Sequence, residues 1–186
     1  CGGMAVSFPR KRYFMELKNF ARAAGYYLFA EALCLFLTLT LAVFHGTPIR
    51  AVSTICTIGV LICLCVNFAV RRGREDQRSK REDTARRGLL FSAMIGLPYL
   101  LLGIALILAR AGVLPDTFFR WYKLLDAAFW QLCNIMSIDV QVSLLRWPHV
   151  IILAVLNLIP PAAVWISYRL TLAGFDPAEL QYRKRR

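Results

Sequence analysis

The sequence has few of the residues from which enzyme active sites and metal sites are built. It contains only two histidines, and neither His45 nor His149 has metal-ligand spacing to another His, Cys or carboxylate. A glycine-rich phosphate loop is missing, and so are the HExxH and GxSxG motifs of metalloproteases and serine hydrolases. These absences argue against the common hydrolase and nucleotide-binding classes. We expect no catalytic residue, no cofactor and no bound metal.

The six cysteines do not change this expectation. Four of them lie inside apolar runs, where a thiol behaves as a small apolar side chain. Cys63 and Cys65 are two residues apart, so on a helix their side chains point about 200° away from each other and cannot hold the same ion. We therefore interpret the cysteines inside the apolar runs as buried free thiols.

Charged residues are scarce, and acidic residues are the scarcer kind. Only 18% of residues are charged, with 11 Asp and Glu against 23 Lys and Arg, whereas 58% are hydrophobic. Soluble globular proteins average about 45–50% apolar residues. The excess lies in four blocks of about 20 residues, each long enough to cross the roughly 30 Å hydrocarbon layer. The sequence predicts an all-α polytopic membrane protein with four transmembrane helices, at about residues 23–44, 49–70, 89–109 and 150–170.

The basic residues divide unequally between the two sides of this four-helix domain, residues 23–170. Segments 1–25, 71–88 and 169–186 carry 5, 8 and 5 Lys and Arg, whereas the turn at Arg50 carries 1 and segment 110–147 carries 4. Loops rich in Lys and Arg stay in the cytoplasm. We therefore expect a multi-pass protein of the cell membrane with both termini cytoplasmic. Its N-terminal segment 1–22, loop 71–88 and tail 171–186 lie inside, and segment 110–149 lies outside.

The basic loop 71–88 raises the question of its partner. It contains no aromatic residue on which a base could stack, so we expect it to contact anionic membrane lipid and not nucleic acid. At the start of the chain, the basic run from Arg10 to Lys18 argues against an external lipid-modified Cys1. We expect Met4 to be the natural first residue.

Polar residues inside the predicted spans are the candidate intramembrane site. Glu31 is the only ionisable side chain well inside a span, where a charge costs about 2.5–3.5 kcal/mol. Tyr27 and Thr38 share its helix face, Asn67 lies in the second span, and Asn157 precedes two consecutive prolines that should kink or break the fourth. Two interpretations remain open, an ion or substrate pathway and a set of interhelical hydrogen bonds.

The external segment from Leu114 to Gln141 is rich in aromatic residues, and its polar residues recur near the helical period. It predicts an amphipathic helix that lies at the outer leaflet or docks against a partner. The candidate interface residues are Phe118, Trp121 and Trp130.

A single buried carboxylate provides little chemistry for catalysis. We expect a non-enzymatic membrane subunit or regulator that binds lipid, another membrane protein or a second copy of itself. The alternative is a small oligomeric channel or transporter that uses Glu31 and the broken fourth helix.

Overall fold

The computed structural model describes residues 10–43, 47–80 and 83–175, and all regular structure in them is helical. The expected start at Met4 and most of the tail lie outside the described residues. The elements, in chain order, are α1 (Arg10–Ala42), α2 (Thr47–Arg78), α3 (Thr84–Arg110), α4 (Phe118–Leu125), the 3₁₀ turn η1 (Ala127–Phe129), α5 (Trp130–Met136), the 3₁₀ turn η2 (Val142–Leu144), α6 (Trp147–Leu156) and α7 (Ile159–Leu172).

Four segments are long and apolar enough to cross a membrane: Asn19–Leu41, Pro48–Arg78, Thr84–Arg110 and Trp147–Leu172. Many of their large apolar side chains point outward, as a lipid-facing surface requires. Leu28, Ile55 and Leu101, for example, are all more than half exposed. The all-α class and the four long apolar helices are therefore confirmed, and the chain is a multi-pass membrane protein on this basis.

The basic segment 71–88 is more ordered than the sequence suggested. Helix α2 continues through it to Arg78 and α3 begins at Thr84, which leaves only a short connection between them. The continuation contains several good helix formers, and Arg72 pairs with Glu75 one turn later at 2.6 Å. The expected loop is thus largely two helix ends.

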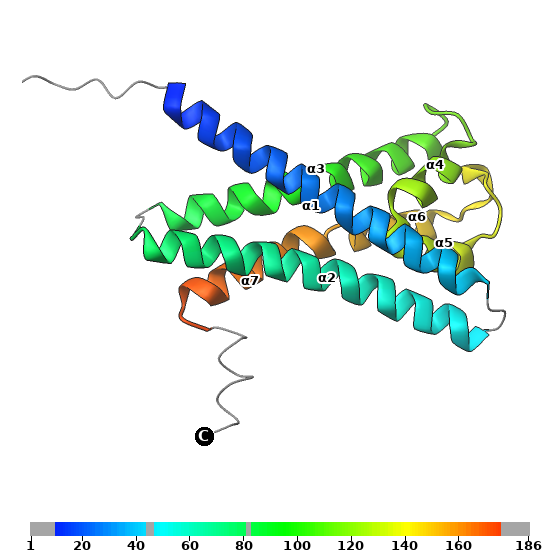
Figure 1. Ribbon diagram of the computed structural model, residues 1–186. Coiled ribbons are helices and arrows are strands. Elements are labelled where there is room, and N and C mark those ends of the chain that lie inside the picture. The colour runs from blue at the N-terminus through cyan, green and yellow to red at the C-terminus, as the bar shows by residue number, and fades with distance from the viewer. Residues whose placement is uncertain (1–9, 44–46, 81–82, 176–186) are drawn as a thin grey trace, which may run out of the picture.

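The fourth span is broken, as the prolines predicted. Helix α6 ends at Leu156 and α7 begins at Ile159, so that Asn157 and Leu158 form a turn in the middle of the span. Pro160 and Pro161 occupy the first turn of α7, where a proline needs no backbone donor. In Figure 1 α7 lies beside α2, and α6 continues it along the bundle toward α4 and α5.

Small residues bring α3 close to this broken helix. A Cβ atom at Gly96 would lie 2.7 Å from Cβ of Pro161, and one at Gly88 would lie 2.5 Å from the ring of Tyr168. The Ser92 hydroxyl donates to the Pro161 carbonyl at 2.7 Å. Close backbone approach through small residues is how membrane helices pack in the absence of a hydrophobic driving force.

The two ends of the bundle differ in character. Where α2 and α3 are joined, Asp76 accepts hydrogen bonds from Arg87 Nε and from the Tyr168 hydroxyl, each at 2.8 Å, which ties three helices together. At the other end, η1 packs against α1 and α2, α5 against α2, and α4 against α3 (Figure 1). The candidate site lies at this second end, which we call the α4–α5 end.

Candidate functional site

The segment between α4 and α5 inserts into the helix bundle. Asp126, Ala127, Ala128 and Phe129 are each at most 1% exposed, and η1 contacts both α1 and α2. Two small alanines allow the backbone of this turn to approach the helices closely. The sequence predicted an amphipathic outer helix in the segment 114–141. The structure has two short helices that flank a buried turn there, so a single amphipathic helix is not confirmed.

Side chains of α1 and α2 satisfy the polar backbone groups of the inserted turn. The Ala127 N–H donates to Glu31 Oε2 at 2.8 Å, and the Thr57 hydroxyl donates to the Ala128 carbonyl at 2.9 Å. The Tyr27 hydroxyl donates to the Leu125 carbonyl at 3.1 Å. Irregular backbone inside a membrane domain is tolerated where protein supplies such partners.

Glu31 begins a chain of hydrogen bonds that reaches the broken helix. Its Oε1 accepts a bond from the Tyr99 hydroxyl of α3 at 2.7 Å. The Asn157 amide, in the break between α6 and α7, donates to the Tyr99 carbonyl at 3.1 Å and to the Tyr122 hydroxyl at 3.2 Å. Glu31, Tyr99, Asn157 and Tyr122 therefore form one buried network that joins four helices.

Asp126 adds a second carboxyl group to this region. Its side chain is fully buried, and neither of its oxygens has a hydrogen-bond partner among the described residues. Burial, followed by the charge of Glu31, raises the pKa of Asp126 well above its usual range. The site thus holds two carboxyl groups in different surroundings: Glu31 accepts two hydrogen bonds, whereas Asp126 accepts none and has the Tyr122 hydroxyl nearby.

The structure brings together some of the residues that the sequence singled out. Tyr27 and Glu31 meet at the inserted turn, and Asn157 is linked to Glu31 through Tyr99. Asn67 does not join them, because its side chain is exposed and accepts a bond from Arg71 Nε at 3.1 Å. Thr38 is buried on the expected face, but it lies beside a separate cavity.

Sequence reasoning missed Tyr99, Tyr122 and Asp126. The tyrosines counted toward apolar runs or an aromatic face, and Asp126 was assigned only to the external segment. The "DAAF" stretch at 126–129, a carboxylate followed by two small residues and a phenylalanine, was the available signal.

The aromatic residues of this region also divide into two groups. Phe119, Tyr122 and Phe129 are fully buried in the helix packing, whereas Trp121 is 61% exposed. Trp130 lines the separate cavity, and Phe118 packs against the cluster that holds Phe119. Trp121 is therefore the candidate interface residue most available to a partner or lipid.

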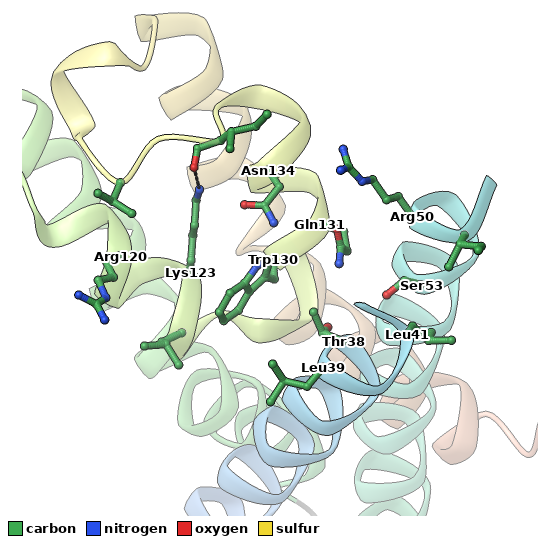
Figure 2. A pocket seen from close by; sticks show the side chains of 14 residues that line it. Thr38, Leu39, Leu41, Arg50, Ser53, Arg120, Lys123, Trp130, Gln131 and Asn134 are labelled. Atoms are coloured by element: carbon green, nitrogen blue, oxygen red, sulfur yellow. Dashed lines mark hydrogen bonds between the residues drawn. The ribbon is translucent and has the colours of Figure 1, made fainter. Parts of the chain in front are cut away.

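A cavity of about 660 Å³ lies between the adjoining ends of α1 and α2 and the helices α4 and α5, and Figure 2 shows it. Three of its lining residues are cationic, namely Arg50, Arg120 and Lys123, and none is acidic. We call it the α4–α5 cavity. An interior of this charge is suited to a ligand with negative charge.

Other polar groups face the α4–α5 cavity. Thr38 and Ser53 are 2% and 1% exposed, and their hydroxyls have no hydrogen-bond partner among the described residues. The amide side chains of Gln131 and Asn134 lie across from them (Figure 2). Buried hydroxyls usually have a partner, so these two are unsatisfied polar groups in the wall of the cavity.

Lys123 has a second role in shaping this cavity. Its ammonium group donates to the carbonyls of Ser137, Ile138 and Asp139 at 2.9, 3.4 and 3.1 Å, and so fixes the loop that follows α5. Burial lowers the pKa of Lys123. Arg50 and Arg120 form no ion pair within the described ranges, so their guanidinium groups are the ones open to a ligand.

No protein-family model, curated protein or solved structure matches the chain. The function is therefore argued from the geometry of the residues themselves.

Proposed function

We propose that the protein is a non-enzymatic membrane protein that binds an anionic phospholipid in the α4–α5 cavity. The observation that carries the proposal is a membrane-end cavity lined by Arg50, Arg120 and Lys123 and by no carboxylate. Basic pockets between membrane helices bind phosphate-bearing headgroups. Arginine suits this task, because its planar guanidinium group can donate two hydrogen bonds to one phosphate.

The size and the walls of the cavity fit an amphipathic ligand. A volume of about 660 Å³ lies in the ordinary range for small-molecule sites, which is roughly 300–1,000 Å³. Leu39, Leu41 and Trp130 supply apolar wall beside the cations, which can receive the beginning of an acyl chain.

The side of the membrane follows from the distribution of basic residues. Because 18 of 23 Lys and Arg lie in segments 1–25, 71–88 and 169–186 of the sequence, we place the end of the bundle where α2 and α3 are joined in the cytoplasm. The α4–α5 cavity then faces the external leaflet. Binding of a lipid there is consistent with a subunit or regulator whose conformation depends on the surrounding membrane.

Transport through the bundle receives less support from the geometry. Both Glu31 oxygens are occupied by donors from the protein. The cavity beside Tyr27 and Tyr99 has a volume of about 10 Å³, close to the lower limit for one water molecule. This arrangement suits a locked polar network better than an open pathway.

Native mass spectrometry of the purified protein can test lipid binding. Phosphatidylglycerol should remain bound where phosphatidylcholine does not. Hydrogen bonds to charged groups contribute about 1.5–3 kcal/mol, so Arg50→Gln or Arg120→Gln should weaken the preference roughly tenfold or more. Arg146→Gln is the matched control, since Arg146 lies exposed at the same end of the bundle but does not line the cavity.

Two outcomes would count against the proposal. Equal retention of both lipids by the wild-type protein would remove the anion site. Equal loss in the Arg146→Gln control would show that the preference comes from general surface charge. Competition with inorganic phosphate distinguishes the ligands, because a lipid site should retain phosphatidylglycerol when free phosphate is in excess.

A further inference from the structure

Asp126 is buried, and among the described residues only the nearby Tyr122 hydroxyl favours its charged form. It lies between α4 and η1, is 0% exposed, and has no hydrogen bond to either carboxyl oxygen in the described part of the chain. An ionised carboxylate in such a place costs several kcal/mol unless it is paired or bonded. The geometry therefore suits the neutral acid.

Glu31 faces the same turn, but both of its carboxyl oxygens accept hydrogen bonds. Its Oε2 accepts from the Ala127 N–H, a group that can only donate, and its Oε1 accepts from the Tyr99 hydroxyl. Two donors aimed at two oxygens is the arrangement that a carboxylate needs. Since Ala127 directly follows Asp126 in the chain, the two carboxyl groups are held in one small volume.

Within the part of the chain that the structure describes, no cation forms an ion pair with either carboxyl group. The titratable groups that interact with Asp126 are all acids. They are Tyr27, Glu31 and Cys34 from α1, Tyr99 from α3, Tyr122 from α4, and Cys133 from α5. From α2, Thr57 bonds the Ala128 carbonyl, and Cys65 interacts with Glu31. Lys123 belongs to the same helix end, but its ammonium group is held by the carbonyls of residues 137–139.

We propose that Asp126 is a proton-binding site of the membrane domain, which holds a proton while Glu31 carries the negative charge. When Asp126 releases its proton to water, a second negative charge appears beside Glu31, with only the Tyr122 hydroxyl among the described residues to stabilise it. The turn 126–129 then separates from α1 and α2, and this separation allows water to hydrate the ionised Asp126. Proton uptake from water reverses the step, and only the Asp126 O–H bond is formed or broken.

The direction of the pH dependence follows from the pKa of Asp126, which burial and the charge of Glu31 raise. The inserted state binds more protons than the released state. Protonation of Asp126 therefore stabilises the inserted state fully below the ordinary pKa of an aspartic acid. This stabilisation is lost as the pH rises through the raised pKa of Asp126. The turn 126–129 should therefore separate from α1 and α2 at alkaline pH and remain inserted at acidic pH.

Infrared spectroscopy of the protein in lipid nanodiscs tests where the proton is. A protonated carboxyl group has a C=O stretching band that a carboxylate lacks, and the band shifts in D₂O. We expect this band near neutral pH in the wild type, its loss in Asp126→Asn, and its retention in Glu31→Gln. Asp139→Asn, which changes an exposed aspartate of the neighbouring loop, should also retain it.

The same samples can show whether proton loss releases the turn. Amide hydrogen exchange of residues 126–133, corrected for the intrinsic rate at each pH, should accelerate in the wild type as the infrared band disappears. Asp126→Asn is always neutral, so its corrected exchange should stay unchanged over the same pH range. The wild-type titration alone tests the proposal should the variant fail to fold.

Several results would overturn the inference. A wild-type protein without the band would place no proton on the pair. A band lost in Glu31→Gln but kept in Asp126→Asn would place the proton on the other carboxyl group. Exchange that does not change with the band, or that accelerates equally in Asp126→Asn, would separate the proton from the position of the turn.

Discussion

The hydrogen bond between Tyr99 and Glu31 should make a measurable contribution to the stability of the bundle. Tyr99→Phe removes only the hydroxyl, which lies 2.7 Å from Glu31 Oε1, in a side chain that is 1% exposed. The ring keeps its edge contact with Tyr27, whose centroid lies 5.2 Å away. The variant therefore changes one hydrogen bond and leaves the aromatic packing in place.

We expect Tyr99→Phe to lower the free energy of unfolding by about 2 kcal/mol. A hydrogen bond to a charged group contributes about 1.5–3 kcal/mol, and a buried acceptor left without its donor costs about 1–3 kcal/mol. The measurement is reversible unfolding by SDS in mixed micelles, followed by helical circular dichroism. A change of this size is large against a total stability that is usually about 5–15 kcal/mol.

Tyr26→Phe provides the matched control. Tyr26 is the neighbour of Tyr27 in α1, its ring packs against Phe68 at 5.1 Å, and its hydroxyl makes no hydrogen bond in the described part of the chain. Removing the Tyr26 hydroxyl should lower the free energy of unfolding by less than about 0.5 kcal/mol. Equal effects of the two variants would refute the argument, because the stability would then not depend on the bond to Glu31. In a Glu31→Gln background, Tyr99→Phe should cost less, since the acceptor is then neutral.

Two further predictions concern orientation and partners. Reporter fusions after Arg87 and after Arg186 should both give a cytoplasmic signal, and one after Ile138, which is 78% exposed, should give an external signal; an external signal at Arg87 would contradict the topology. We also expect at least one of Phe118→Leu, Trp121→Leu and Trp130→Leu, made singly, to lose a co-purifying membrane protein or self-association while still inserting normally, because a few aromatic anchors carry most of an interface's energy. Trp121 is the foremost of these, as it is the most exposed, and retention of every partner by all three variants would leave lipid as the remaining ligand class.

The long helices could be predicted because the signal for them is local. A run of about 20 apolar residues gives a span without any knowledge of its neighbours. The break at Asn157 was also readable, since Pro160 and Pro161 cannot continue a helix hydrogen-bond pattern. The hydropathy pattern could not predict where a helix ends beyond its apolar span. Helix α2, for example, continues to Arg78 through a strongly charged segment.

The inserted turn could not be predicted in this way, because its partners lie far away in the sequence. Glu31 bonds to Ala127 across 96 residues and to Tyr99 across 68 residues. The period of the segment 114–141 matches a helix on both sides of the turn, so a helical pattern alone gives one continuous element. Only the contacts with α1 and α2 show that Asp126 faces inward.

The two proposed sites share the same elements, and this has a thermodynamic consequence. Lys123, Leu124 and Trp130 line the α4–α5 cavity, and the turn that holds Asp126 lies between Leu124 and Trp130 in the chain. A lipid that binds only when α4 and α5 are in place also favours the inserted turn, and therefore favours the protonated form of Asp126. Linkage is reciprocal, so the proton must raise the affinity for the lipid by the same factor. Lipid affinity that falls as the pH rises, and that stays constant in Asp126→Asn, is the behaviour that this shared architecture requires.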